Sequence, residues 1–438
     1  MSQSGSTFYI WTAGCQMNDG DSLRLAEELS ARGFRQVDTP DDATVVVLNT
    51  CVVRQSAENR AYGRLNSLKP LKRRHPDMLI AVMGCLVGVS GDEAGLAARY
   101  PFVDMWLPPS RFEALLERLD TQATANAMGC APASPLNPAS PVARYVTIMT
   151  GCNNFCSYCI VPYRRGRERS RPVHEVLGEC QRVARLGARE VTLLGQNVDS
   201  YGADLPGQPS LAALLRAVHE IEALQRIRFL TNHPKDMSQE LIETVAGLPK
   251  VCEHIELPLQ SGNDEILRRM NRHYTAEQYL DLIQRIRHSL PGVALATDVI
   301  VGFPGENEQQ FLDTYRLLEQ VRFDAVHVAC YSPRPGTAAA QLADDVPAEE
   351  KERRRQLIER LQERVVGEIN RALVGKEVEV LFEDQVRGKW RGRTRTNKLT
   401  FVNSDIPLAG RLAMVKVEWA GPWSMRGQVV AADAPAFR

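Results

Sequence analysis

The most informative stretch of the sequence is Gly151-Cys152-Asn153-Asn154-Phe155-Cys156-Ser157-Tyr158-Cys159. Its cysteines have the spacing C-x3-C-x2-C, directly after an apolar segment that is typical of a strand. Three thiolates on one tight loop can bind three corners of a cubane iron–sulfur cluster. No fourth cysteine is near, so one iron keeps an open position, which is typical of a reactive metal centre. A zinc knuckle or ordinary loop cysteines are the alternatives, although zinc would need a fourth Cys or His nearby.

Strand and helix patterns alternate on the carboxyl side of this loop. Predicted strands cover residues 144–149, 190–195, 226–231, 254–258, 294–302 and 325–331, and predicted helices cover 173–186, 210–221, 238–246, 275–289 and 308–320. Repeated βα units favour a parallel sheet with right-handed crossovers, either open or closed into a barrel. The fold class is therefore α/β.

A second set of cysteines lies in the first 120 residues. Apolar runs at 8–12, 43–49 and 78–83 predict buried parallel strands, and Cys15, Cys51 and Cys85 follow these three strands. The carboxyl ends of parallel strands share one edge of the sheet, so we expect these cysteines to form a second three-thiolate metal site. The other four show no such grouping, and we assign them no role: Cys130, Cys180, Cys252 and Cys330.

Composition changes mark the domain boundaries. Residues 121–141 are rich in Ala, Pro, Ser and Asn and predict a linker. Residues 347–372 predict a highly charged helix with a solvated face, and short strands separated by turns after Gly375 predict a small antiparallel barrel. We expect an N-terminal α/β domain at 1–122, a linker at 123–141, a central domain at 142–372 and a barrel at 373–438.

Charge and hydropathy limit the choice of partners. The 438 residues include 53 basic and 53 acidic side chains, so any argument for a nucleic-acid partner must be local. No secretory signal is visible, and the most apolar uncharged stretch, 78–90, is shorter than the roughly 18–20 residues that span a bilayer. We expect a cytoplasmic protein with no membrane association.

Two basic clusters are candidates for RNA contact. The predicted barrel contains Trp390 and a run of cations without an intervening acid, Arg387, Lys389, Arg391, Arg393, Arg395 and Lys398. Alternate residues of a strand share a face, so this strip would suit phosphates, with Trp390 available for stacking on a base. Arg164, Arg165 and Arg167 form the second cluster, beside the cysteine loop. The strip on the barrel could instead be a solubilising surface strand, and the second cluster could instead form ion pairs within the fold.

The cysteine loop, with Tyr158 before its last cysteine, resembles the radical S-adenosylmethionine (SAM) superfamily. The resemblance implies a partial (βα)6 barrel in which the open iron binds SAM. Cleavage of SAM then gives a 5′-deoxyadenosyl radical. The positions that match SAM-binding elements of the superfamily are Tyr158, Gln196, Asn197, Asp298 and Gly302.

The order of the parts resembles the methylthiotransferase family, which has an N-terminal three-cysteine domain, a radical SAM domain and a C-terminal TRAM barrel. The matching N-terminal motifs are Gly14-Cys15-Gln16-Met17-Asn18, Asn49-Thr50-Cys51 and Gly84-Cys85. The resemblance implies two [4Fe–4S] clusters and two SAM molecules per product. One SAM methylates a sulfur held on the N-terminal cluster, and the other supplies the radical that activates an unreactive carbon.

Residues 162–172 and 194–202 are most similar to the branch that methylthiolates carbon 2 of isopentenylated (dimethylallyl) adenosine at tRNA position 37. The implied partners are the anticodon stem-loop of tRNA, a low-potential electron donor such as flavodoxin or ferredoxin, and a sulfur source, with a monomer expected. Sister branches act on threonylcarbamoyladenosine in tRNA or on an aspartate of a ribosomal protein. Outside the enzymes, a non-catalytic iron–sulfur RNA-binding regulator and a zinc-stabilised RNA-binding protein are the competing hypotheses.

Overall fold

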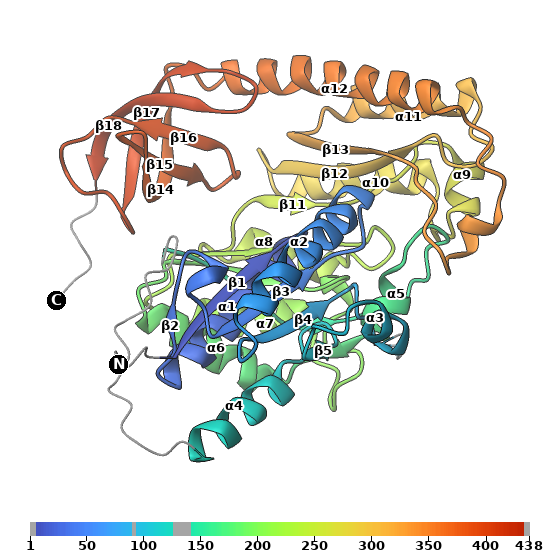
Figure 1. Ribbon diagram of the computed structural model, residues 1–438. Coiled ribbons are helices and arrows are strands. Elements are labelled where there is room, and N and C mark those ends of the chain that lie inside the picture. Colours follow the sequence, from blue (N-terminus) through green and yellow to red (C-terminus); the bar gives the residue numbers. More distant parts are fainter. Residues whose placement is uncertain (1–5, 90–92, 126–141, 433–438) are drawn as a thin grey trace. The chain divides into compact units, whose positions relative to one another are not determined.

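The computed structural model describes residues 6–89, 93–125 and 142–432 (Figure 1). The chain divides into two compact units. The first comprises Met1–Ala139, Thr150–Phe155 and Cys159–Arg169, and the second comprises Ser140–Met149, Cys156–Tyr158 and Ser170–Arg438. The C-x3-C-x2-C loop therefore contributes residues to both units.

The first unit is built on a five-stranded parallel sheet. In spatial order its strands are β2 (Arg35–Gln36), β1 (Thr7–Thr12), β3 (Val45–Thr50), β4 (Leu79–Gly84) and β5 (Met105–Leu107). Its helical segments are α1 (Gln16–Ala31), η1 (Pro40–Asp42), α2 (Gln55–Arg74), α3 (Glu93–Arg99), α4 (Glu113–Ala125) and α5 (Val161–Arg165).

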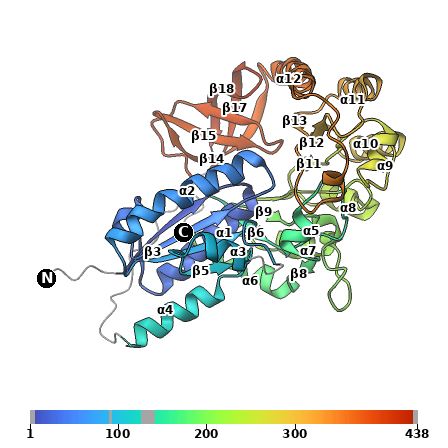
Figure 2. The same cartoon turned by 45° about the vertical axis from the view of Figure 1, so that its right-hand side comes forward.

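Helices cover both faces of this sheet, which explains the continuous apolar runs of its central strands. Alternate residues of a strand point to opposite faces. Val46 and Leu48 of β3 lie in one core cluster with residues of α2, and Val45 and Val47 lie in another with residues of α1 and α4. Every residue of β3 and β4 is consequently buried. Figure 2 shows α2 along one face of the sheet.

Six parallel strands form the centre of the second unit. They are β6 (Ala143–Thr147), β9 (Glu190–Leu194), β10 (Arg226–Phe229), β11 (His254–Glu256), β12 (Ala294–Val301) and β13 (Ala325–Cys330), arranged as the three-stranded sheets β10-β9-β6 and β11-β12-β13. A bridge between Ile227 and Val251 connects β10 to the segment before β11. The predicted succession of six βα units is confirmed.

The connecting helices agree with the predicted ones to within a few residues. They are α6 (Val173–Arg185), α7 (Leu211–His219), α8 (Gln239–Gly247), α10 (Ala276–Ser289) and α11 (Glu308–Val321). Both α10 and α11 begin with a capping box, formed by Thr275 with Gln278 and by Asn307 with Gln310, which satisfies otherwise unpaired backbone N–H groups. Shorter elements are β7 (Met149–Thr150), β8 (Arg169–Ser170), η2 (Val198–Ser200), α9 (Asp264–Arg269) and η3 (Ala338–Gln341).

The last part of the second unit is a small closed barrel, as predicted. Helix α12 (Ala348–Arg371) leads into its strands, which are β14 (Glu377–Val386), β15 (Lys389–Thr394), β16 (Leu399–Val402), β17 (Leu412–Ala420) and β18 (Met425–Ala432) (Figure 1). The order around the barrel is β14-β15-β16-β18-β17, with antiparallel pairs except β16–β18. The prediction that the charged side chains of α12 are solvated is wrong for Lys351 and Arg354, which are buried, and Arg354 pairs with Glu306 at 2.9 Å.

The predicted linker is described only at its start. Helix α4 continues to Ala125, into the segment that composition assigns to a linker, and residues 126–141, with Cys130, lie outside the described residues. The proposed domain boundaries at residues 122, 141 and 372 stay predictions. In the part of the chain that the structure describes, no helix has the length and apolarity needed to cross a membrane.

Candidate functional site

The three N-terminal cysteines follow three neighbouring strands of the first unit. Cys15 comes after β1 and is the N-cap of α1, Cys51 directly follows β3, and Cys85 directly follows β4. Because β1, β3 and β4 are adjacent and parallel, the three residues lie at one edge of the sheet. Cys51 and Cys85 are buried, and Cys15 is partly exposed.

Glycines before two of these cysteines allow the strand ends to approach closely. Gly14 has a φ of +125°, and a Cβ on it would lie 2.3 Å from Cys51 Cβ and 2.9 Å from Cys51 Sγ. Gly84 has a φ of +100°, and a Cβ there would lie 2.4 Å from the carbonyl oxygen of Thr50. A side chain at either position would push neighbouring backbone apart. The Gly-Cys pairs therefore keep the thiols near one another.

The thiols of Cys15 and Cys51 form a hydrogen-bonded pair. This bond is the main factor that lowers the pKa of Cys15 to about 6, and the positive charge of Arg165 acts in the same direction. The bond and burial raise the pKa of Cys51. The position of Cys15 at a helix N-terminus also favours a thiolate. At least one member of the pair is therefore ready to bind metal as an anion.

The donor set fits an iron–sulfur cluster. Among the described residues, no three His, Cys, Asp or Glu side chains are grouped around one position as ligands of a single metal ion. A cubane cluster has a different requirement, because each thiolate binds a separate iron. The N-terminal set meets this requirement, because it has three buried or half-buried thiols at one sheet edge with a cation beside them.

Arg165, the last residue of α5, is buried against this cysteine site. Its Nε donates to Cys85 Sγ at 3.3 Å and its Nη2 donates to Asn18 Oδ1 at 2.8 Å. Its Nη1 lies 3.3 Å from Ser110 Oγ and 3.8 Å from Asp21 Oδ2. The prediction that Arg165 contacts RNA is therefore wrong, since burial and these contacts direct its guanidinium into the protein.

The start of the C-x3-C-x2-C loop lies in the first unit and packs against residues 166–168. Cys152 N donates to the carbonyl oxygen of Gly166 at 3.1 Å, and Asn153 bonds through both N and Nδ2 to Glu168, each at 3.1 Å. Gly151 has a φ of +81°, and a Cβ on it would lie 2.0 Å from the Arg167 carbonyl oxygen. Close backbone packing thus fixes the conformation of the loop at Gly151 and Cys152. Cys159 belongs to the same unit, two residues before α5.

In the second unit, Cys156 is buried beside another arginine. Arg272 Nη1 donates to Cys156 Sγ at 3.4 Å, and Nη2 donates to the carbonyl oxygen of Pro258 at 3.0 Å. Arg272 is itself buried, and Tyr274 Oη accepts from its Nε at 3.0 Å. Each cysteine set therefore has one sulfur that accepts a hydrogen bond from a buried guanidinium.

Polar side chains gather beyond the carboxyl ends of β9 and β10. Asn197 donates to Asp236 at 2.8 Å. Asp199 accepts from the side chain of Asn232 and, at 2.8 Å, from the backbone N–H of His233. Burial raises the pKa of Asp199 to about 7 and lowers the pKa of His233 to about 2. This edge of a parallel α/β sheet is where ligands bind.

Two carboxylates lie on the neighbouring strands β11 and β12. Burial raises the pKa of Glu256 to about 7, with a further contribution from the negative charge of Asp298. Glu256 accepts a hydrogen bond from Thr231 N at 3.3 Å. When ionised, the pair provides negative charge on β11 and β12 that could attract a cationic ligand group such as an ammonium or sulfonium.

Two other predicted SAM-binding residues, Tyr158 and Gly302, have packing roles that the structure defines. Tyr158 packs on a small core cluster that includes Met270 and Phe303. Gly302 has a φ of +68°, and a Cβ on it would lie 2.3 Å from Lys351 Cγ, so the glycine makes room for the buried Lys351 side chain. SAM contacts by Tyr158, Gln196, Asn197, Asp298 and Gly302 stay predictions.

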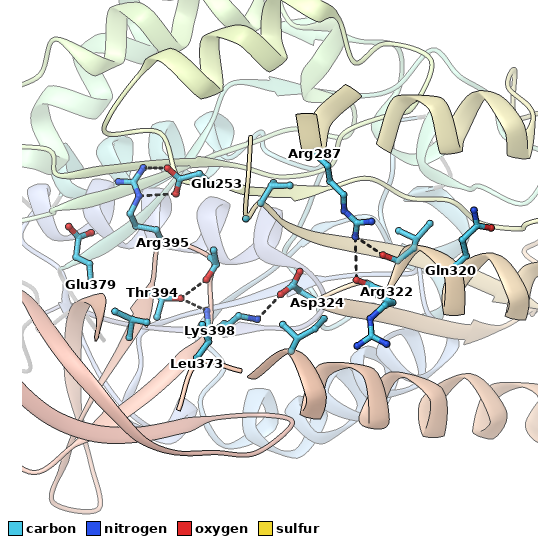
Figure 3. Close-up of a pocket in the computed structure, with 16 residues that line it drawn as sticks. Glu253, Arg287, Gln320, Arg322, Asp324, Leu373, Glu379, Thr394, Arg395 and Lys398 are labelled. Atoms are coloured by element: carbon cyan, nitrogen blue, oxygen red, sulfur yellow. Dashed lines mark hydrogen bonds and ion pairs between the residues drawn. The ribbon is translucent and has the colours of Figure 1, made fainter. Parts of the chain in front are cut away.

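The predicted RNA strip on the barrel is largely neutralised by internal contacts. Arg391 forms a bidentate pair with Asp384, and Arg393 lies 3.6 Å from Glu383. Arg395 pairs with Glu253, and Lys398 donates to Asp324 at 2.6 Å (Figure 3). Trp390 is half-buried and its Nε1 donates to the carbonyl oxygen of Ser404. RNA contact by this strip stays a prediction, although most of its charge is compensated by acidic side chains.

The contacts of Arg395 and Lys398 dock the barrel on the central domain. Glu253 and Asp324 directly precede β11 and β13, and Arg226 and Arg228 of β10 donate to barrel carbonyl oxygens in return. Glu253, Asp324, Arg395 and Lys398 line a cavity of about 640 Å³ (Figure 3). Docking therefore uses the amino ends of the central strands, the edge opposite to the polar side chains described above.

Another part of the barrel has cations that stay available. Among the described residues, Arg387 and Lys389 make no ion pair. Lys389 lines a cavity of about 290 Å³ together with Trp419 and Arg426. Trp419 is 46% exposed, and the Arg426 guanidinium lies 4.6 Å from its ring centre. Sequence reasoning misses this group, which we call the tryptophan patch, because Trp419 and Arg426 are distant from the basic run in sequence.

Comparisons with known proteins agree with these parts. The family model of the Radical SAM superfamily matches residues 146–318, that of "Uncharacterized protein family UPF0004" matches 7–108, and that of the TRAM domain matches 371–430. Among solved structures, the radical S-adenosylmethionine methyltransferase TsrM from Kitasatospora setae has a TM-score of 0.55 at 14% identity, over 78% of this chain and 77% of that one. Fold and site thus define a radical SAM enzyme.

Relatives of similar length are much closer in sequence. The tRNA-2-methylthio-N(6)-dimethylallyladenosine synthase of Dehalococcoides mccartyi (strain CBDB1) is 49% identical, over 97% of this chain and 98% of that protein. The synthase of Roseiflexus sp. (strain RS-1) is 47% identical, over 97% and 90%. This chain belongs to the family of the tRNA-2-methylthio-N(6)-dimethylallyladenosine synthases. Family membership implies SAM and two [4Fe–4S] clusters as cofactors.

Proposed function

We propose that this enzyme replaces the hydrogen on carbon 2 of N6-dimethylallyladenosine in tRNA, at position 37 next to the anticodon, by a methylthio group. The observation that carries the proposal is the presence of two separate three-cysteine sets in a chain that matches synthases of this name along almost its whole length. A non-catalytic iron–sulfur regulator would not need two sets, each leaving one iron without a protein ligand.

We assign a different role to each of the two cysteine sets. Cys152, Cys156 and Cys159 would hold the cluster that binds SAM, and Cys15, Cys51 and Cys85 would hold the cluster that handles sulfur. When bound, SAM and the clusters supply a radical that removes a hydrogen atom and a methylated sulfur that takes its place. The protein positions these groups and surrounds them with polar side chains. The polar group around Asn197 and the Glu256–Asp298 pair would orient SAM.

The tryptophan patch is our candidate for the RNA contact of the barrel. Lys389 and Arg426 would contact phosphates, and Trp419 would stack on an unpaired base, as aromatic side chains do in many RNA-binding proteins. Arg387 extends the charge along the β14–β15 turn. On the other unit, Arg164 and Arg167 are further candidates near the cysteine loop.

Two further partners follow from the chemistry. The reaction needs a low-potential electron donor, for which flavodoxin or ferredoxin is suitable, and a source of sulfur. We place the reaction in the cytoplasm, where tRNA is available, and we expect a monomer.

The test is a complete reaction under anaerobic conditions. The reconstituted enzyme would be incubated with SAM, reductant and tRNA that carries dimethylallyladenosine, followed by mass spectrometry of the digested nucleosides. A 2-methylthio nucleoside supports the proposal. Formation of 5′-deoxyadenosine without that product contradicts the substrate and directs the test to threonylcarbamoyladenosine tRNA and ribosomal protein. No 5′-deoxyadenosine, despite two intact clusters, contradicts the catalytic role.

A further inference from the structure

The position of Arg165 connects the two cysteine sets. Arg165 lies six residues after Cys159, yet its side chain contacts residues of the N-terminal segment of the same unit: Cys85, Asn18, Ser110 and Asp21. The segment between Cys159 and Arg165 is short and well packed, since Ile160 is buried in the core cluster of β3 and β4.

The guanidinium is also a fixed positive charge in an environment with little water. Only 7% of Arg165 is exposed, and an arginine side chain stays protonated in proteins. A buried charge is costly unless opposite charge lies near it. Asp21 lies 3.8 Å away, beyond hydrogen-bond distance. The nearest sulfur, Cys85 Sγ, accepts directly from Nε at 3.3 Å. The negative charge of a bound cluster would add to that of Asp21 in stabilising the buried guanidinium.

We propose that Arg165 is a positioning residue that holds Cys85 in its ligating geometry and sets the reduction potential of the N-terminal cluster. This inference rests on the proposed function, because it requires a cluster on Cys15, Cys51 and Cys85. Hydrogen bonds to sulfur and nearby charge both tune the potential of such clusters. A cation stabilises the more negative, reduced state, so Arg165 keeps the potential higher than it would otherwise be.

The potential can be measured without interference from the other cluster. The full-length variant Cys152→Ala/Cys156→Ala/Cys159→Ala, reconstituted anaerobically, would contain only the N-terminal cluster. A redox titration followed by electron paramagnetic resonance gives its midpoint potential, and the rate of iron loss to a chelator gives its retention. Arg165→Met and Arg165→Lys are then compared in this background, with Arg169→Met as a control that removes an exposed arginine of the same segment.

We expect Arg165→Met to shift the midpoint to more negative potential and to speed iron loss about 10-fold, the lower end of the effect of losing an outer-shell partner. Arg165→Lys keeps the charge but loses the fork of donors, so its potential should stay near that of the parent while iron is lost faster. Arg169→Met should match the parent in both measurements. Comparison with Arg165→Lys, which keeps the charge, separates a shift caused by charge from one caused by altered packing and solvent access.

Parent-like potential and iron loss in Arg165→Met would overturn the inference. If Arg165→Met fails to fold by circular dichroism, Arg165→Met/Asp21→Asn removes both buried charges and takes its place. Faster iron loss is then expected with a smaller negative shift, because loss of the Asp21 carboxylate raises the potential and offsets part of the effect. If neither folds, Arg165→Lys decides, and parent-like iron loss in that variant overturns the inference. Failure of the parent to bind any cluster would instead contradict the proposed function.

Discussion

The guanidinium of Arg395 forms a bidentate ion pair with the carboxylate of Glu253, with distances of 2.8 Å from Nε to Oε2 and 2.7 Å from Nη2 to Oε1. The same guanidinium donates to the carbonyl oxygens of Pro249 and Val251. Planar, paired hydrogen bonds of this kind are stronger and more specific than single ones. Arg395 therefore fixes the orientation of the barrel on the central domain.

Substituting Arg395→Ala should loosen the barrel. We expect a loss of about 2 kcal/mol in unfolding free energy, because Glu253 and two carbonyl oxygens lose a charged donor. Thermal unfolding and hydrogen exchange of β15 and β16 would measure the change. Arg387→Ala removes the same charge from an exposed position of the barrel, so it should change stability by less than about 0.5 kcal/mol. Equal effects of the two variants would show that Arg395 does not dock the barrel.

The two cysteine sets should be separable by their products. Replacing Cys152, Cys156 and Cys159 with Ala should abolish formation of 5′-deoxyadenosine, because no thiolate is left to hold the SAM-binding cluster. Replacing Cys15, Cys51 and Cys85 should leave some 5′-deoxyadenosine but no methylthio nucleoside. Both products would be followed by mass spectrometry over many turnovers. Continued methylthiolation by the N-terminal triple variant would contradict the sulfur role of that set.

The Gly14→Ala substitution should remove the N-terminal cluster selectively. Its methyl group would lie 2.3 Å from Cys51 Cβ, so the strand ends must separate. We expect iron bound at the N-terminal set to fall by about 10-fold or more, while the SAM-binding cluster is retained, as judged by iron analysis and 5′-deoxyadenosine formation. Gly63→Ala, within α2, meets nothing within 4 Å and should leave the iron content unchanged. Full iron in Gly14→Ala would contradict the close approach of the thiols.

The tryptophan patch should control RNA affinity. Trp419→Ala should weaken binding of the tRNA anticodon stem-loop by about 1–3 kcal/mol, the usual value of one stacked base. Lys389→Ala should reduce the slope of log affinity against log salt by about 1. Arg364→Ala removes an exposed cation of α12 and should leave that slope unchanged. Binding would be measured by fluorescence anisotropy at several salt concentrations, and equal slopes for Lys389→Ala and Arg364→Ala would exclude Lys389 from the interface.

Glu256 should make stability fall as pH rises. Burial, with the charge of Asp298, raises its pKa to about 7 in the folded protein, whereas an unfolded glutamate has a pKa of about 4.3. Between these values the folded state binds the extra proton, so unfolding becomes easier with increasing pH. Glu256→Gln lacks this proton. From pH 6 to pH 8 the unfolding free energy of the parent, measured by chemical denaturation, should fall by about 1 kcal/mol more than that of Glu256→Gln. Parallel pH profiles of the two proteins would rule out the raised pKa of Glu256.

The elements that the sequence predicts well are those set by local pattern. The apolar runs of β3 and β4 are continuous because helices cover both faces of their sheet, so they can be recognised without knowledge of the partners. The N-terminal cysteines can be grouped from their positions after strands, since parallel topology brings such ends to one edge. The basic run of the barrel is misleading, because its acidic partners, Asp384, Glu253 and Asp324, are not in the run itself.

By itself, the sequence determined the two cysteine sets, the succession of βα units and the closing barrel, and therefore the family. These features depend on spacing and periodicity within short segments. Only the tertiary structure decided which cations are available for a partner. Arg165 meets Cys85 across 80 residues of chain, and Arg395 meets Glu253 across 142. The physical reason is that a charge is neutralised by whichever group the fold brings within a few ångströms, and that distance is independent of separation along the chain.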